Sequence, residues 1–446
     1  MHSHNRTNGP DRLAAGAAFM LLGAVQVTLV GAITVITVAL PVIGRDLHLD
    51  ESGLVLVSSG YGISFGGLLP AGGRLADRLG CRRVFVTGTA VFGVASAGAG
   101  LAPWAGLLVA ARLAEGAGAA LAAPSAVALL GAVFPDPDRH GRALATWGVL
   151  SSAGAIAGTV ASGVAVTWLP WRWLFAVPAV VAAIAVAVAH RVLPAGPAPV
   201  RAKTDWPGAV LAATGLAVLI YGLQRSGWAV AAGAALLAGF ALAERRHPDP
   251  LVPLPFLARR ALPLVAVLAC AAAMATAFFL LSLYLQQVRG LSALRVSLIF
   301  LLAAPAAVAA GPLAGRLLRR FGVRPVLAAG LLTAAAGLLL LSFLGAPYAG
   351  LLIFPFGTGL AFSAALVTVM HDAGAAQAGL AGALVSTAME TGPPLGLAVL
   401  TWAAAAYSRD PAAGYPFALR TAAILLLALS LFTMTGQHPS RPQEEK

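Results

Sequence analysis

The chain has 446 residues, of which 59% are hydrophobic and only 10% are charged, and its mean hydropathy is +0.87. Soluble globular domains carry about 25% charged residues, so this composition excludes an ordinary soluble enzyme. It also excludes an intrinsically disordered chain, because such chains are poor in apolar residues. The formal net charge is nonetheless +13. In a soluble protein that value would point to nucleic acid, so its meaning depends on where the charges lie.

Long apolar runs follow one another along nearly the whole chain. A helix needs about 20 apolar residues to cross a bilayer, and the sequence predicts fourteen such spans. Their richness in Ala, Leu, Val and Gly without strict alternation favours helices over outer-membrane strands. The first run is too long for a cleaved signal peptide, so it is predicted to remain as a span. The runs are 13–40, 53–72, 84–102, 104–133, 143–168, 172–193, 208–225, 227–243, 263–285, 294–315, 325–344, 347–370, 378–407 and 417–436.

Basic residues gather on one side of these predicted spans. With the N-terminus in the cytoplasm, 21 of the 29 Lys and Arg residues fall in cytoplasmic segments and 7 in external ones. Such an excess marks cytoplasmic segments of membrane proteins. The bias predicts an even number of spans with both termini in the cytoplasm, and it explains the net charge without nucleic acid. The preference for Arg over Lys and the richness in Ala and Gly suggest a bacterium, and hence its inner membrane.

A ten-residue pattern occurs twice. The loop after the second predicted span has the sequence GRLADRLGCR (73–82), and the loop after the tenth has GRLLRRFGVR (315–324), identical at six of ten positions. The offset covers eight spans, and both copies face the same side. A parallel repeat of two six-helix bundles with two extra helices between them explains this spacing. It predicts an all-α polytopic membrane protein with bundles at 1–200 and 259–446 and an insertion at 201–258.

The first copy also carries chemistry. Gly73 and Gly80 would allow a tight turn, and Asp77 lies among arginines with which it could pair. Such a cluster can hold one conformation and release it in another. The plainer alternative is a solvated basic loop that only sets topology. The residues of the predicted conformational latch are Gly73, Asp77, Arg78, Gly80, Arg82 and Arg83.

With this loop and the repeat, the sequence resembles the major facilitator superfamily, and in particular its 14-span drug:proton antiporter group, over about residues 13–436. The resemblance implies the major facilitator fold and secondary active transport. It extends to the end of the first span, where this chain has Ala32 at the group's acidic position and Thr37 at its Asn position. The missing acid removes one usual element of proton coupling.

The fourth span contains Arg112 and Glu115 within a motif similar to the family's, which usually has Gln in place of Glu115. A charge at the bilayer centre costs about 2.5–3.5 kcal/mol on insertion scales. Residues three apart share a helix face, so these two can pair. Arg112 stays charged, which leaves Glu115 as the group able to exchange a proton. The alternative is a structural pair that fastens helices together.

The fifth span contains Gly154, Gly158 and Gly163, and the first two form a small-xxx-small face that permits close helix approach. The pattern resembles the antiporter motif of exporters, with Thr159 in place of the usual Pro and Ser162 in place of Gly. Simple close packing is the alternative to a role in the direction of transport.

Glu390 in the thirteenth span is the other intramembrane acid, and it precedes Pro393 and Pro394, which would break or kink the helix. A carboxylate on such a helix suits a coupling or substrate-binding site. The alternative is that it pairs with a hydroxyl group or lies near an aqueous end. Gln26 and Tyr61, inside apolar runs, are further candidates for a substrate cavity, together with Glu390.

The sequence has no phosphate-binding loop and no paired cysteine or histidine spacing typical of a metal site. We therefore expect no enzyme activity, no cofactor and no metal, with a proton gradient as the source of energy. The main hypothesis is a proton-coupled exporter of hydrophobic or amphipathic drugs or antibiotics that works as a monomer in the lipid bilayer by alternating access. The alternatives are a transporter dedicated to one metabolite, such as a self-made antibiotic, and a non-transporting receptor or scaffold.

Overall fold

The computed structural model describes residues 9–194, 206–225, 227–246, 254–343, 347–371, 374–408 and 410–435. Every regular element within these ranges is helical, and each of the fourteen predicted spans overlaps a helix. Ten helical stretches of the described chain are long and apolar enough to cross a membrane. The elements are α1 (Gly9–Asp46), α2 (Glu51–Leu79), α3 (Cys81–Gly100), α4 (Ala105–Val133), α5 (Pro137–Trp168), η1 (Trp171–Phe175), α6 (Ala176–Val192), α7 (Trp206–Arg225), α8 (Gly227–Arg246), α9 (Leu254–Arg259), α10 (Ala261–Leu283), η2 (Tyr284–Val288), α11 (Ala293–Leu301), α12 (Ala303–Phe321), α13 (Val323–Leu341), α14 (Tyr348–His371), α15 (Gly374–Tyr407) and α16 (Pro411–Thr435).

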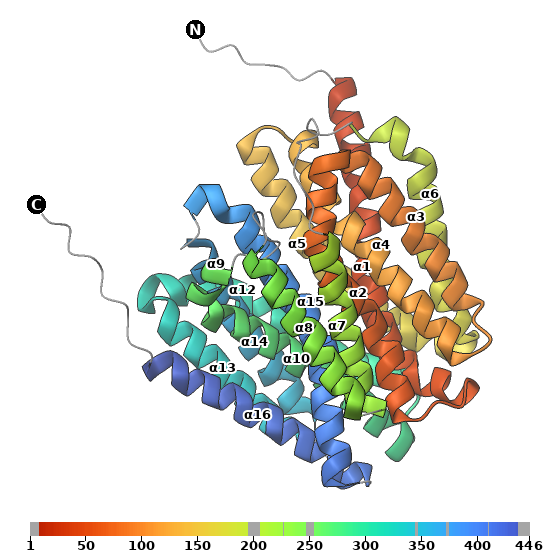
Figure 1. Ribbon diagram of the computed structural model, residues 1–446, viewed down its shortest axis with the longest axis vertical. Coiled ribbons are helices and arrows are strands. Elements are labelled where there is room, and N and C mark those ends of the chain that lie inside the picture. Colours follow the sequence, from red (N-terminus) through yellow and green to blue (C-terminus); the bar gives the residue numbers. More distant parts are fainter. Residues whose placement is uncertain are drawn as a thin grey trace, which may run out of the picture.

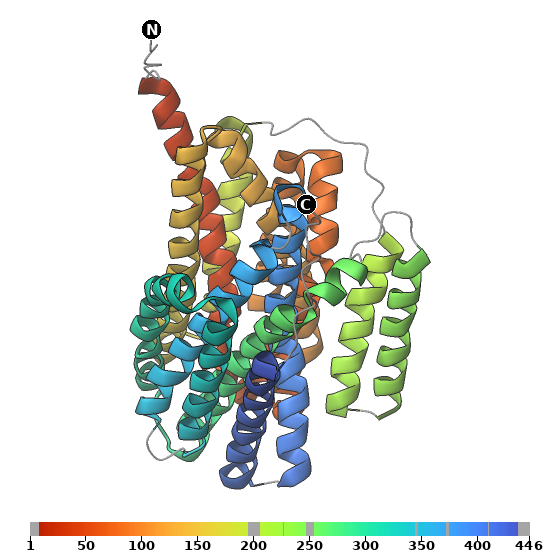
Figure 2. The ribbon, with the colours of Figure 1, turned by 90° about the vertical axis from the view of Figure 1, so that its left-hand side faces the viewer.

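The helices form two groups. Figure 1 shows α1–α6, coloured red to yellow-green, on one side and α10–α16, coloured green to blue, on the other. We refer to them as the N-terminal group and the C-terminal group. Helices α2 and α15 pack against each other where the groups meet. The pair α7–α8 stands to one side as a hairpin (Figure 2), and α7 contacts both α2 and α15.

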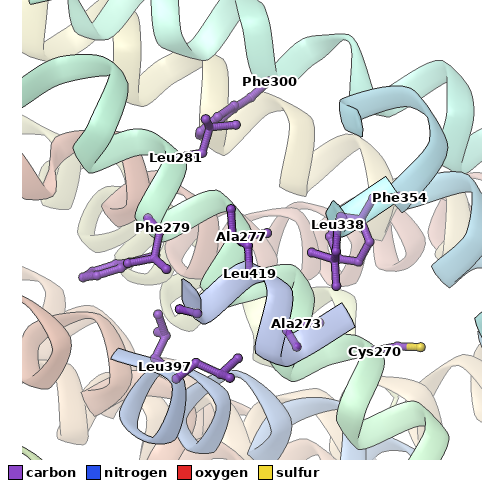
Figure 3. Packing of buried hydrophobic residues seen from close by; sticks show 14 of the residues in the cluster. Cys270, Ala273, Ala277, Phe279, Leu281, Phe300, Leu338, Phe354, Leu397 and Leu419 are labelled. Atoms are coloured by element: carbon purple, nitrogen blue, oxygen red, sulfur yellow. The ribbon is translucent and has the colours of Figure 1, made fainter. Parts of the chain in front are cut away.

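The hydrophobic core shows where the two groups are joined. One cluster of buried residues lies wholly within the N-terminal group and includes Leu22, Phe85 and Leu129. A second cluster combines the last turns of α1, such as Ile36 and Ile43, with the core of the C-terminal group. Figure 3 shows the C-terminal part of this second cluster around α10. The groups therefore share a core at the end of the bundle where α1 finishes, which we call the closed end.

In both copies of the repeated pattern, a glycine with positive φ joins two helices. Gly80 joins α2 to α3 with φ of 94°, and Gly322 joins α12 to α13 with φ of 78°. Only glycine takes up such angles at little cost, which explains why both copies have it at this position. The predicted loop is shorter than expected, because α2 continues to Leu79. Gly73 lies inside that helix, so its predicted role in a tight turn is wrong. We call this end of the bundle the turn end.

Candidate functional site

The most deeply buried charges of the described chain form one ion pair. Arg112 and Glu115 on α4 are both fully buried, and Nη1 of Arg112 lies 2.7 Å from Oε2 of Glu115. The predicted pairing is thus confirmed as a contact. Ser96 on α3 donates to the other carboxylate oxygen at 2.7 Å, and Arg112 also donates to the carbonyl of Ala32 on α1 at 3.1 Å. The pair therefore fastens three helices of the N-terminal group together.

Tyr61 on α2 completes this cluster. The guanidinium carbon of Arg112 lies 5.0 Å from the centroid of the Tyr61 ring, a cation–π geometry. The Tyr61 hydroxyl donates to the carbonyl of Leu29 at 3.2 Å, and its side chain is buried. Tyr61 was predicted as a cavity residue; in this conformation it packs within the N-terminal group. Nε and Nη2 of Arg112 have no protein acceptor among the described residues, so the pair is not fully satisfied.

Glu390 lies on the other side of this cluster, on α15, where the two groups meet. A Cβ at Gly66 of α2 would lie 3.2 Å from the carbonyl carbon of Glu390, and one at Gly62 would lie 3.2 Å from Pro394. The glycines of α2 thus let the α15 backbone come close. Gly62 follows Tyr61 on α2, and a Cβ there would also lie 3.4 Å from the Glu390 carbonyl oxygen. Glu390, Tyr61 and Arg112, which the sequence singled out separately, therefore lie in one region. Helix α15 continues through Pro393 and Pro394, so of the predicted break or kink, the break does not occur.

The glycines of α5 permit close helix contact, as predicted. A Cβ at Gly154 would lie 2.7 Å from the Val27 carbonyl oxygen of α1, and one at Gly158 would lie 2.6 Å from that of Gly31. Both distances are shorter than a methyl group tolerates. Gln26, one of the predicted cavity residues, also lies at this contact.

Helix α5 makes two further contacts, one through Ser151 with Gln26 and one through Gly163. Gln26 of α1 donates to Ser151 of α5 at 3.0 Å, so its amide is engaged within the N-terminal group. Gly163 packs instead against Ser297 of α11, in the C-terminal group. The predicted motif therefore serves two contacts, one within a group and one between the groups.

The predicted latch residues lie at the turn end, on the surface. Asp77 is exposed and has no ion pair within 4 Å among the described side chains, although the charge of Arg74 acts on it. Arg82 donates to the carbonyl of Leu193, beyond the end of α6, at 3.1 Å. In this conformation Asp77 forms no ion pair with Arg78, Arg82 or Arg83.

Two sets of contacts at the closed end were not predicted. Asp46 at the end of α1 accepts from Trp171 Nε1 at 2.9 Å and from Arg172 Nη1 at 2.7 Å. Ser282 and Gln286 of the C-terminal group donate to backbone carbonyls of α1 at 3.0 Å each. An apolar sequence gave no pattern from which to pair these polar side chains, because their acceptors are backbone carbonyls or residues more than 100 positions away.

Known proteins match the chain in sequence and in fold. The family model described as Major Facilitator Superfamily matches residues 21–397. The chain belongs to the major facilitator superfamily. It is 36% identical over 436 residues to the puromycin resistance protein of Streptomyces alboniger, covering 90% of this chain and 85% of that one. It is also 36% identical to the cephamycin export protein of Amycolatopsis lactamdurans, over 90% and 88% of the two chains.

Solved transporter structures share this architecture. A POT-family transporter in complex with a thioalcohol-conjugated peptide superposes with a TM-score of 0.70 at 14% identity, covering 94% of this chain and 95% of that one. At this identity the likeness shows the fold alone. With the family match, it establishes that this transporter is a multi-span membrane protein and not an enzyme.

Proposed function

We propose that this protein exports antibiotic-like small molecules across the bacterial inner membrane and that an inward flow of protons drives the export. The observation that carries the proposal is the similarity, over nine tenths of the chain, to a puromycin resistance protein and a cephamycin export protein. A lincomycin resistance protein of Streptomyces lincolnensis is a further relative, at 31% identity over 88% of this chain.

The proposed topology has fourteen membrane helices with both termini in the cytoplasm. Six helices belong to residues 1–200 and six to 259–446, with the insertion 201–258 between them, and the protein works as a monomer. The overlap of each apolar run with a helix and the excess of cytoplasmic arginine support this arrangement. In this orientation the closed end faces outward and the turn end faces the cytoplasm.

We assign proton coupling to Glu390, with the Arg112–Glu115 pair as the second candidate. Both oxygens of Glu115 are occupied by donors from its own group, so exchange of a proton there would first have to break those bonds. The backbone of Glu390 packs against Gly62 and Gly66 of α2, where the two groups meet. When a carboxylate at the contact between α2 and α15 gains a proton, the charge between the two groups changes. That change of charge favours one arrangement of the groups over the other.

Asp77 is proposed to act in the opposite conformation. Its exposure and its lack of an ion pair fit a latch that is released when the closed end is shut. Closure of the turn end would bring Asp77 against the C-terminal group and restore its partners.

Efflux of puromycin tests the proposal. Cells that express the protein should survive higher puromycin concentrations than cells with an empty vector, and they should retain less radiolabelled puromycin. A proton uncoupler should abolish the difference in retention. Export that persists after the gradient collapses contradicts proton coupling, whereas equal retention in both strains contradicts puromycin export.

A transporter dedicated to one compound is the second candidate. It is favoured by relatives whose names each specify a single antibiotic. A resistance panel of puromycin, lincomycin, a cephamycin and ethidium distinguishes the two. Protection against several unrelated compounds supports a multidrug exporter, and protection against one supports a dedicated exporter.

A further inference from the structure

Two polar side chains of the C-terminal group reach across to α1 at the closed end. The Ser282 hydroxyl on α10 donates to the carbonyl of Thr37 at 3.0 Å, and the Gln286 amide on η2 donates to the carbonyl of Val38 at 3.0 Å. Gln286 also donates to Ser282 at 3.0 Å. The bonds from Ser282 and Gln286 to α1 both join the C-terminal group to the N-terminal group.

Pro41 explains why an acceptor is available on α1. A residue at position 41 would normally donate its backbone N–H to the carbonyl four residues earlier, which is that of Thr37. Proline has no N–H group and lies inside α1, so the helix cannot satisfy this carbonyl itself. The contact is shielded from solvent, because Val38 and Ser282 are fully buried. A buried carbonyl without a donor is costly, and Ser282 supplies the donor from the opposite group.

The donor side is locally unusual as well. Residues Tyr284–Val288 form a π-helical turn, and single π turns are rare and occur frequently at functional sites. Gln286 lies in the middle of this turn. Gln286 lies four residues after Ser282, and the two side chains donate to consecutive carbonyls of α1.

We infer that Ser282 and Gln286, together with the Thr37 carbonyl that Pro41 leaves free, form a gate that holds the closed end shut. The inference rests on the alternating-access part of the proposed function. When the closed end opens, both hydrogen bonds break and water replaces the donors at the α1 carbonyls. The state shown here therefore loses stability relative to the open one whenever these donors are removed.

A distance measurement in the purified full-length protein tests the gate. Arg45 and Arg289 are exposed at the ends of α1 and η2, so spin labels on Arg45→Cys and Arg289→Cys report separation at the closed end. The two native cysteines are buried and can be replaced by alanine. In Ser282→Ala/Gln286→Leu we expect the ratio of long-distance to short-distance populations to rise about tenfold, as the loss of two hydrogen bonds implies.

Two controls separate the gate from general packing. Thr276 is a buried hydroxyl residue on the same helix, and it donates to the Ala272 carbonyl within α10 at 2.9 Å. Because this bond does not join the two groups, Thr276→Ala should leave the populations unchanged. Pro41→Ala restores a donor within α1 for the Thr37 carbonyl. In that background Ser282→Ala should shift the populations less than it does alone.

Gln286→Leu alone keeps the inference testable if the double variant does not fold, because Gln286 is only partly buried. Unchanged populations in a folded Gln286→Leu or Ser282→Ala variant would overturn the inference, as would equal effects of Ser282→Ala with and without Pro41. The distance readout needs no transport, so a protein that shifts as expected but exports no puromycin contradicts the proposed function and leaves the gate standing.

Discussion

Arg112 and Tyr61 lie against each other inside the N-terminal group, with the guanidinium carbon 5.0 Å from the ring centroid. Nη1 of Arg112 donates to Glu115 and to the Ala32 carbonyl, whereas Nε and Nη2 have no acceptor in the described part of the chain. The aromatic face therefore adds an attraction for a cation whose hydrogen bonds are only partly made.

Glu115→Gln should destabilise the protein strongly. The change leaves the fully buried Arg112 charge without a counter-charge, and breaking such a pair typically costs about 3–5 kcal/mol. We expect a clear fall in the midpoint of thermal unfolding of the purified protein, followed by tryptophan fluorescence. Arg172→Lys, at the exposed pair with Asp46, is the matched control and should cost less than about 1 kcal/mol.

The double variant Arg112→Met/Glu115→Leu separates structure from transport. Apolar residues of similar size often replace a buried ion pair without loss of stability, so its midpoint should lie above that of Glu115→Gln. If puromycin efflux is lost while stability returns, the charges act in transport. If efflux returns with stability, the pair is structural, and proton coupling rests on Glu390 alone.

Glu390→Gln tests proton coupling at the contact between α2 and α15. Glutamine has nearly the same shape but cannot exchange a proton, so the packing of α15 on α2 through Gly62 and Gly66 should be preserved. In proteoliposomes, uptake of puromycin driven by an imposed pH gradient should fall at least about tenfold, while exchange of puromycin without a gradient persists. Glu390→Asp should retain part of the gradient-driven rate. Full gradient-driven uptake by Glu390→Gln would exclude this residue as the coupling group.

The contact between α1 and α5 should be sensitive to a single methyl group. In Gly158→Ala the new Cβ would lie 2.6 Å from the Gly31 carbonyl oxygen, whereas in Gly98→Ala it would meet nothing within 4 Å. We expect Gly158→Ala to lower the thermal midpoint, because overpacking costs about 1–3 kcal/mol. Gly98→Ala should be neutral or stabilising by about 0.5–1 kcal/mol, since alanine favours the helix. Equal midpoints for both variants would contradict the close α1–α5 contact.

The sequence predicted what depends on local pattern. The apolar runs placed the helices because their length and composition are properties of one segment, and the three-residue spacing of Arg112 and Glu115 gave their contact because both lie on one helix. The glycines of α5 predicted that another helix comes close, but they did not predict which helix. Gly163 meets Ser297 of the C-terminal group, and nothing in residues 154–163 specifies a helix more than 130 positions away.

The Asp46 contacts could not be predicted for the same reason, because Trp171 and Arg172 lie more than 100 positions from Asp46. The gate could not be predicted for a further reason. Ser282 and Gln286 donate to backbone carbonyls, and every residue has one, so the sequence carries no complementary side chain to search for. Pro41 was the available signal, since it frees the carbonyl of Thr37. The sequence also assigned Gly73 to a turn because glycine permits one. A glycine within a helix and a glycine at a turn look the same in the sequence, and only the backbone angles distinguish them.

The two turn glycines and Gly73 give the last prediction. Gly80 and Gly322 have φ of 94° and 78°, where a side chain costs about 1–3 kcal/mol of strain. Gly80→Ala and Gly322→Ala should therefore each lower the thermal midpoint by a similar amount, because they occupy equivalent places in the repeat. Gly73 lies inside α2, and the nearest atom to a Cβ there is 3.9 Å away on Pro124. Gly73→Ala should be tolerated or slightly stabilising; a loss as large as that of Gly80→Ala would restore Gly73 to the turn.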